Sequence, residues 1–284
     1  MSHTPDFRLA VLGSPIAHSQ SPALHAAAYR VLGLDWEYDA IEVTGDTLAD
    51  FVDARDATWR GLSLTMPLKR DVIPLLDRSD DLVSLTGSAN TVLFRGKGSK
   101  RYLHGFNTDV YGITQAINRR GHSIGGVVQI LGGGATAASA VVAAQLLGAT
   151  RAYVSVRTPA RSADLVALGE RAGIEVIVGT LEDAGTLPEQ PGLILSTLPN
   201  GADVTVLFAA ATMRAAVLFD VAYHPWPSAR AAEWQAVGGT VISGLDMLVL
   251  QALIQVRIFV NGSAEQLVPK EAAVLAAMYA AVGL

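Results

Sequence analysis

Short apolar runs alternate with helical patterns from residue 127 onward. Glycine, proline or polar residues bound each run, which is typical of strands that are buried on both faces of a sheet. Strands that alternate with helices favour an α/β fold with a doubly wound parallel sheet, because each crossover between parallel strands carries a helix. The predicted strands are 127–131, 152–156, 175–178, 193–197, 217–221 and 240–242.

The first part of the chain also alternates, but it lacks a glycine-rich turn. A seam follows at Asn107-Thr108-Asp109, where a helix over 110–120 leads into the second unit. Two apolar helices, 245–259 and 269–282, come after the last strand and can pack back on the first unit. At 284 residues the chain exceeds one average domain, and we predict two, 1–108 with 245–284 and 109–244. In the first domain we expect strands at 8–12, 37–43 and 61–65 and helices at 22–32, 47–55 and 67–76.

The segment Gly132-Gly133-Gly134 follows the predicted strand 127–131 and precedes a helix of small residues. Gly132 and Gly134 fill the first two positions of the dinucleotide-binding fingerprint, and Ala137 fills the third. Without Cβ atoms the backbone can turn sharply and approach a pyrophosphate at the helix N-terminus. Such turns are common, but strand 152–156 ends where this fold places its ribose-binding residue. We therefore predict a Rossmann-type unit.

The end of that second strand distinguishes NAD from NADP. An acidic residue there would accept hydrogen bonds from the ribose hydroxyls of NAD. This chain has Arg157, Thr158 and Arg161, and no acid before Asp164. Guanidinium groups offer a planar fork of donors that suits the oxygens of a 2′-phosphate. We predict NADP as the cofactor; the alternative is that both arginines lie on one turn of a solvated helix face.

Composition narrows the class of protein. A net charge of −5 and an isoelectric point near 5.7 argue against nucleic acid or an anionic membrane as partner. The absence of cysteine excludes thiolate metal sites, the six histidines form no metal-like cluster, and we expect no metal. Residues 123–150 carry no charge, but a strand–turn–helix explains them better than a membrane span. Without a signal peptide we expect a cytoplasmic protein, and the sequence leaves a homodimer open.

Polar residues of the first unit gather where its predicted strands end. Ser19 and Ser21 follow the first strand and would point the same way in an extended loop, although Ser21 is also a good N-cap. Lys69 falls on the first turn of a helix, where the dipole disfavours a cation and so suits a proton-transfer group. An exposed lysine tolerates that position cheaply. Asn90 and Asp109 occupy similar junctions, and Asp109 has an alternative role as helix cap.

The order of these motifs resembles that of the shikimate dehydrogenase family over nearly the whole chain. Any one motif is modest evidence, whereas their joint occurrence in order is highly specific. The matching segments are Ser19-Gln20-Ser21-Pro22 with His25, Thr65-Met66-Pro67-Leu68-Lys69, Ser88-Ala89-Asn90-Thr91, Gly105-Phe106-Asn107-Thr108-Asp109, the turn at Gly132, Arg157-Thr158, residues 220–225, and Gly244-Leu245-Asp246-Met247-Leu248 with Gln251.

The resemblance implies an oxidoreductase that interconverts 3-dehydroshikimate and shikimate with NADP, in chorismate and aromatic amino-acid biosynthesis. The first domain would bind substrate, and the Rossmann-type domain would bind NADP. Lys69 and Asp109 would be the catalytic pair that assists proton transfer. Substrate contacts would come from Ser19, Ser21, Thr65, Asn90, Tyr223 and Gln251. Cofactor contacts would come from Gly132, Gly133, Gly134 and Ala135 at the pyrophosphate, from Arg157, Thr158 and Arg161 at the 2′-phosphate, and from Thr197, Leu198, Val221, Gly244 and Met247 beside the nicotinamide.

Four positions depart from the family pattern. Ala26, Ser63 and Val156 stand where it commonly has asparagine, and Ser228 stands where threonine is frequent. Two alternatives stay open. One is a quinate/shikimate or aminoshikimate dehydrogenase, which would differ in the hydroxyl or amine that its pocket accepts. The other is a non-catalytic nucleotide-sensing protein that has kept the fold, although a pure sensor has no need of a proton-transfer pair.

Overall fold

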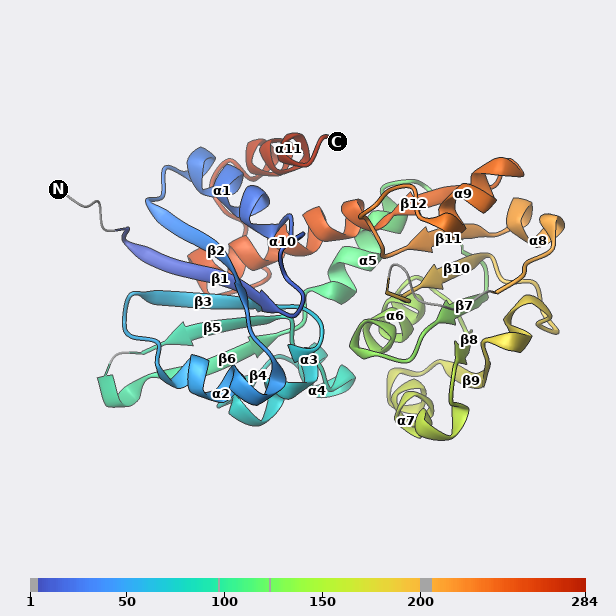
Figure 1. Cartoon of the computed structure of the whole chain (residues 1–284), viewed down its shortest axis with the longest axis horizontal. Helices are drawn as coiled ribbons and strands as arrows, with labels where there is room; N and C mark the ends of the chain where they lie inside the picture. The colour runs from blue at the N-terminus through green and yellow to red at the C-terminus, as the bar shows by residue number, and fades with distance from the viewer. Residues whose placement is uncertain (1–4, 97, 123, 200–205) are drawn as a thin grey trace. The chain divides into compact units, whose positions relative to one another are not determined.

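The computed structural model describes residues 5–96, 98–122, 124–199 and 206–284. The chain divides into two compact units (Figure 1). Unit 1 comprises Met1–Thr108 and Leu248–Leu284, and unit 2 comprises Asp109–Met247. Unit 2 is therefore inserted in the sequence between the two stretches that build unit 1.

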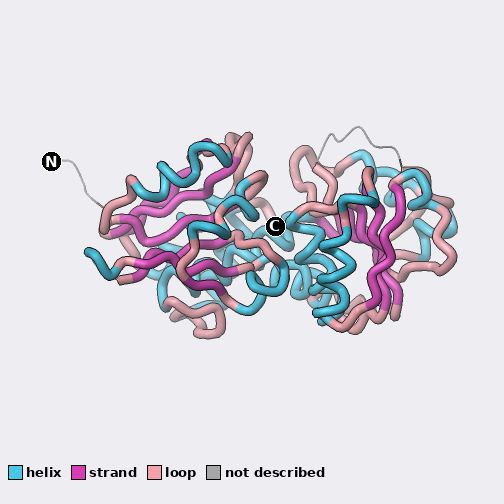
Figure 2. The backbone as a smooth tube through the Cα atoms, turned by 90° about the horizontal axis from the view of Figure 1, so that it is seen from below, coloured by secondary structure: helices cyan, strands magenta, loops and turns pink. Residues whose placement is uncertain are grey.

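Unit 2 contains a six-stranded sheet in the order β12-β11-β10-β7-β8-β9, with every neighbouring pair parallel. The strand order reverses between β7 and β10, so right-handed crossovers place helices on both sides of the sheet, as Figure 2 shows. The predicted doubly wound fold is confirmed. The strands are β7 (Val127–Leu131), β8 (Arg151–Val156), β9 (Glu175–Thr180), β10 (Leu193–Ser196), β11 (Val217–Asp220) and β12 (Val241–Ser243), and the helices are α5 (Asp109–Asn118), α6 (Ala135–Leu146), α7 (Ala163–Ala172), α8 (Ala210–Ala215) and α9 (Ala229–Ala236).

Unit 1 has a mixed sheet in the order β2-β1-β3-β5-β6-β4. The pairs β2/β1, β1/β3 and β4/β6 are parallel, whereas β5 is antiparallel to both β3 and β6. Because β5 runs the other way, it begins at the edge where β1, β3 and β6 end. The strands are β1 (Phe7–Gly13), β2 (Trp36–Glu42), β3 (Trp59–Leu64), β4 (Arg78–Ser79), β5 (Thr91–Arg95) and β6 (Tyr102–Phe106), and the helices are α1 (Ser21–Leu32), α2 (Gly45–Asp53), α3 (Leu68–Asp71), α4 (Asp81–Thr86), α10 (Gly244–Asn261) and α11 (Glu271–Ala281).

Unit 1 differs from its prediction in two places. The predicted helix 67–76 ends early: α3 stops at Asp71, and a separate 3-10 turn covers Ile73–Leu75. Pro74 explains the break, because proline lacks an amide hydrogen and its ring clashes with the preceding helical turn. The strands β4, β5 and β6 were not among the predicted elements, and with them the antiparallel part of the sheet was missed.

Two apolar stretches have the composition of membrane spans, and both serve packing. The uncharged residues 123–150 include β7 and α6, and most residues of α6 are buried. Helix α10 is also long and apolar enough to span a membrane, but 72% of it is buried inside the protein. It lies so close to the unit 1 sheet that a Cβ on Gly61 of β3 would be 2.4 Å from Phe259 Cε1 of α10.

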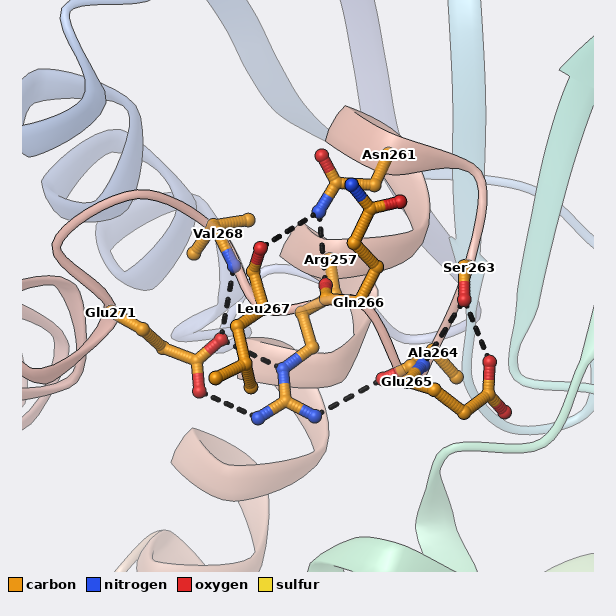
Figure 3. A network of polar contacts seen from close by, with 9 residues as sticks. All are labelled: Arg257, Asn261, Ser263, Ala264, Glu265, Gln266, Leu267, Val268 and Glu271. Atoms are coloured by element: carbon orange, nitrogen blue, oxygen red, sulfur yellow. Dashed lines mark hydrogen bonds and ion pairs between the residues drawn. The ribbon is translucent and has the colours of Figure 1, made fainter.

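The connection between α10 and α11 is fixed by Arg257, as Figure 3 shows. Its Nε and Nη2 donate to the two carboxylate oxygens of Glu271 at 2.8 and 2.5 Å, and its Nη1 donates to Ala264 O at 3.1 Å. Asn261 Nδ2 holds the same loop by donating to Gln266 O at 2.9 Å. This bidentate, mostly buried pair ties the end of α10 to the start of α11, so the glutamines farther up α10 have a defined position.

Candidate functional site

Three strand ends and one strand start meet at one edge of the unit 1 sheet. The Thr65 amide donates to Leu12 O at 2.9 Å and joins the ends of β3 and β1. The Leu64 amide donates to Asn90 O at 2.8 Å, and the Asn90 amide donates to Phe106 O at 3.1 Å. The main-chain bonds of the sheet therefore bring the predicted residues Thr65 and Asn90 to the same edge.

Lys69 is tied to this edge through its backbone. It is the second residue of α3, on the first turn as predicted, and it is half-buried. The Leu68 amide donates to Thr65 O at 2.8 Å, and the Ala89 amide donates to Lys69 O at 2.8 Å. The first turn of α3 is thus fixed between Thr65 and the residue that precedes Asn90.

Gln251 reaches the same edge from α10. Its Oε1 accepts hydrogen bonds from Asn90 Nδ2 at 3.2 Å and from Thr108 Oγ1 at 3.1 Å. Asn90 Nδ2 also donates to Thr108 Oγ1 at 2.8 Å, and Asn90 Oδ1 accepts from the Thr108 amide at 2.9 Å. All three residues are buried. Two predicted site residues that lie far apart in sequence therefore share one hydrogen-bond network.

The segment after β6 is anchored by Asn107. Its Nδ2 donates to Ser88 O at 3.2 Å, and its backbone amide donates to Asp80 Oδ2 at 3.2 Å. Asp109 is the first residue of α5 and is buried. One peptide bond joins Asp109 to Thr108, so its backbone follows directly on the network around Asn90.

The serine loop differs from its prediction. Helix α1 begins at Ser21, and Gln20 occupies the cap position with an αR backbone, so the alternative role of Ser21 as N-cap is wrong. The expectation of an extended loop is wrong too, because this αR residue separates the serines, and the Ser21 amide donates to Ser19 Oγ at 3.3 Å. The loop leads from the carboxyl end of β1, the strand beside β3. Both serines stay candidates for contacting a ligand at this edge.

The glycine turn of unit 2 contains approaches that a side chain would block. Gly132 has a φ of 110°, and a Cβ on it would lie 2.5 Å from Thr197 Oγ1. A Cβ on Gly133 would lie 2.9 Å from Cγ1 of the buried Val156, so a side chain at position 133 would clash with it. Gly134 caps α6, and nothing lies within 4 Å of the position of its Cβ. With Ala135 as first helical residue, the turn fits a pyrophosphate at the helix N-terminus.

The side chains expected at a 2′-phosphate lie beyond the end of β8. Arg157 and Thr158 follow this strand and are exposed, and Arg161 is exposed at the end of the 3-10 turn Pro159–Arg161. Because α7 begins only at Ala163, the alternative that both arginines lie on one helical face is wrong. Their placement after the second strand of the fold fits a phosphate on the ribose.

The remaining predicted cofactor residues follow the other strands of unit 2. Thr197 comes after β10, the neighbour of β7, and its Oγ1 donates to Leu131 O at 2.8 Å. Gly244 packs so tightly that a Cβ on it would lie 2.1 Å from Val221 O. Leu198, which follows Thr197 in the sequence, is half-buried. Met247 lies in the first turns of α10 and is buried. These residues lie at the carboxyl edge of the sheet, where such folds bind their ligands.

The loop after β11 contains Tyr223, which is half-buried and belongs to unit 2. Burial raises the pKa of this tyrosine, so it is a neutral hydroxyl near pH 7. Ser228, a departure from the family pattern, donates to Asp220 Oδ2 at 2.6 Å and caps α9 by accepting from the Ala231 amide. The loop after β10 also follows a strand end at the carboxyl edge of the sheet, where the sequence predicts a contact with cofactor or substrate over 196–201. Its last two residues, 200 and 201, lie outside the described part of the chain.

Sequence reasoning missed two residues that support the unit 1 edge, the half-buried Asp80 and the buried Gln255. Asp80 caps α4 by accepting from the Val83 amide at 2.6 Å and also accepts from the Asn107 amide. Gln255 donates to Asn90 O at 3.3 Å. The signal for Gln255 was its place one helical turn after Gln251 in a mostly apolar helix, a spacing that puts both on the same face.

Comparison with known proteins agrees with this geometry. Residues 11–92 match a family described as the shikimate dehydrogenase substrate binding domain. A curated relative, the shikimate dehydrogenase (NADP(+)) of Caulobacter vibrioides, is 36% identical over 258 residues, which cover 86% of each chain.

Solved structures of shikimate dehydrogenases are similar to this chain over nearly its whole length. Mycobacterium tuberculosis shikimate dehydrogenase is 38% identical, with a TM-score of 0.78 and coverage of 96% of this chain and 99% of the other. Shikimate 5-dehydrogenase from Thermus thermophilus, solved in complex with NADP(H) and shikimate, is 29% identical, with a TM-score of 0.78 and coverage of 97% and 99%.

Asp80 makes the stability of unit 1 depend on pH. Burial raises its pKa to about 6 against the effect of its two amide donors, and the neighbouring Asp81 and Glu265 raise it as well. Between about pH 4 and 6 the folded protein holds a proton that the unfolded chain has released, so this group lowers the unfolding free energy as pH rises. Asp80→Asn keeps a capping acceptor without the titration. When the free energy of unfolding is measured in urea, the value for the variant relative to wild type should increase by about 1–3 kcal/mol from pH 4 to pH 7. A difference that does not change with pH would contradict this.

Proposed function

This chain belongs to the shikimate dehydrogenase family, and we propose that it catalyses the reversible NADP-dependent reduction of 3-dehydroshikimate to shikimate. As in the family, this reaction serves chorismate and aromatic amino-acid biosynthesis. We further propose that residues 1–108 with 245–284 bind substrate, that 109–244 bind NADP, and that the enzyme acts in the cytoplasm. The absence of cysteine supports this location, because a protein of the reducing cytoplasm needs no disulfides.

The main support for the site is the hydrogen-bonded edge of unit 1. There Thr65, Asn90 and Gln251 present hydroxyl and amide groups. The backbone oxygen of Lys69 accepts from the Ala89 amide, directly before Asn90. Shikimate is a small ring with hydroxyls and a carboxylate, so it needs several directional polar partners and few apolar ones. We assign the substrate carboxylate to Ser19 and Ser21, and its ring hydroxyls to Thr65, Asn90, Tyr223 and Gln251.

Reduction of a ketone requires a hydride at carbon and a proton at oxygen. NADPH supplies the hydride when bound. We assign the proton to Lys69, whose ammonium first polarises the carbonyl and then protonates the developing alkoxide. Solvent afterwards returns a proton to the neutral amine of Lys69. From the resemblance to the family we assign Asp109 as the second member of the catalytic pair, which assists this proton transfer.

The unit 2 residues fit NADP rather than NAD. The turn Gly132-Gly133-Gly134 with Ala135 suits the pyrophosphate, because its backbone can approach closely at the start of α6. Exposed Arg157, Thr158 and Arg161 offer donors for the 2′-phosphate. Thr197, Leu198, Val221, Gly244 and Met247 are the residues that we assign to the nicotinamide side.

A steady-state assay tests the function itself. We expect the purified protein to form NADPH from shikimate and NADP at alkaline pH, where proton release favours oxidation, and to consume NADPH with 3-dehydroshikimate. Quinate and NAD should be much poorer substrates. A protein that binds NADPH but turns over neither shikimate nor quinate would be a nucleotide sensor, and the proposed function would fail.

Lys69→Ala should lower kcat about 10²–10⁴-fold while changing the KM for shikimate much less, because proton transfer contributes to the transition state. Asp109→Asn should act in the same direction. Ser21→Ala should instead raise KM, since it removes a binding contact. Lys100→Ala is the matched control, because this exposed lysine lies in the β5–β6 connection at the opposite edge of the sheet. Near-normal kcat in Lys69→Ala would remove the lysine from the mechanism.

Arg157→Ala should weaken NADPH binding about 10- to 100-fold, because a charge-assisted hydrogen bond contributes about 1.5–3 kcal/mol. NADH lacks the 2′-phosphate, so its affinity should change little. Fluorescence titration with both cofactors at low and high salt measures the difference. Exposed Arg214 of α8, which precedes β11 and so lies near the amino edge of the sheet, provides the matched control Arg214→Ala. Equal weakening of both cofactors would show that Arg157 does not recognise the phosphate.

A further inference from the structure

Gln255 of α10 is 2% exposed and has a partner at every polar position. Its Oε1 accepts from His25 Nε2 at 3.2 Å and from Ser63 Oγ at 3.0 Å. Its Nε2 donates to Asn90 O at 3.3 Å and to Thr91 Oγ1 at 3.0 Å. A carbonyl oxygen can only accept, so Nε2 must face Asn90 and the orientation of the Gln255 amide is fixed.

The two donors on the other side are oriented by their own surroundings. Ser63 Oγ accepts from Tyr38 OH at 2.7 Å, which directs the Ser63 hydrogen toward Gln255. Burial lowers the pKa of His25 to about 3, so the ring is neutral at pH 7 and carries one hydrogen. Because Gln255 Oε1 can only accept, that hydrogen is on Nε2, and Nδ1 accepts from Tyr29 OH at 3.1 Å.

Thr91 transmits this orientation to the side chain of Asn90. Thr91 Oγ1 accepts from Gln255, so its hydrogen points to Asn90 Oδ1 at 3.0 Å. Asn90 Oδ1 also accepts from the Thr108 amide at 2.9 Å. Two donors thus converge on Oδ1, and Asn90 Nδ2 must face the other way, toward Gln251 Oε1.

We propose that Gln255 is a positioning residue that acts through Thr91 and, together with the Thr108 amide, fixes the amide of Asn90. In that orientation Asn90 Nδ2 can exchange its bond to Gln251 Oε1 for one to a substrate hydroxyl oxygen while it keeps its bond to Thr108 Oγ1. The inference rests on the proposed role of Asn90 in binding shikimate. Gln255 touches no substrate itself. A reversed Asn90 amide would present an acceptor in place of a donor and would oppose two donors on its other side, which a buried network does not tolerate.

Two variants interrupt the relay at different points. Gln255→Met keeps the shape and removes all four hydrogen bonds, and Thr91→Val removes only the transmitting hydroxyl. Each should raise the KM for shikimate about 10-fold and leave the KM for NADP and kcat within about twofold, because the contact serves binding. Since both act on one relay, the double variant should be no worse than Gln255→Met alone. Additive effects of the two substitutions on KM would overturn the proposal.

The matched control is Ile258→Ala. Ile258 is fully buried on the same helix, and its side chain has no polar atom that could take part in the relay. It should lower Tm without raising the KM for shikimate. If it raises KM as much as Gln255→Met does, loss of stability explains the effect and the relay is wrong.

A second measurement needs no turnover. In nitrogen-15-labelled protein, the side-chain amide signals of Asn90, assigned by their loss in Asn90→Asp, should exchange slowly with solvent in wild type and faster in both variants. Unchanged exchange in both variants would overturn the relay. Slow exchange in a wild-type protein that does not oxidise shikimate would leave the relay standing and overturn the proposed function.

Discussion

The requirement that buried polar groups find hydrogen-bond partners governs how α10 packs in unit 1. This mostly apolar helix carries Gln251, Gln255 and Arg257, all of which are buried. An unpaired buried polar group costs about 1–3 kcal/mol. Sliding the helix by one residue would leave several such groups unpaired, and this cost would add to that of the lost apolar contacts. Apolar packing brings α10 against the sheet, and directional bonds from its polar side chains select the position in which Gln251 meets Asn90.

Unit 2 could be predicted almost completely because its information is local. A strand, a glycine turn and a helix of small residues follow one another without interruption, and the turn requires glycine for steric reasons that single positions reveal. Gly132 has a positive φ, and a Cβ on it would clash with Thr197, which follows the neighbouring strand β10. The placement of Arg157 beyond β8 follows from the same local pattern, because the strand end alone decides it.

Unit 1 could be predicted only in part, because its decisive contacts are distant in sequence. An apolar run indicates that a strand exists but not its direction. The sequence therefore did not predict that β5 is antiparallel to β3, or that the start of β5 lies beside the end of β3. Pro74 divided a helix that hydrophobic spacing had joined. The resemblance to a known family identified Asn90 and Gln251, whereas Gln255 acquires its partners only through tertiary packing. The roles of these side chains toward ligands stay predictions.

The insertion of unit 2 between the two stretches of unit 1 also sets an order of events during synthesis. Residues 109–247 are complete before 248–284 have been made. At about 5–20 residues per second, a nascent chain has all six strands of the nucleotide unit for some seconds before α10 leaves the ribosome. During that interval the start of β5 lacks its helix, and water must take the place of Gln251 Oε1 as an acceptor for Asn90 Nδ2. The edge that holds Asn90 is therefore completed only after every strand of the nucleotide unit has been made.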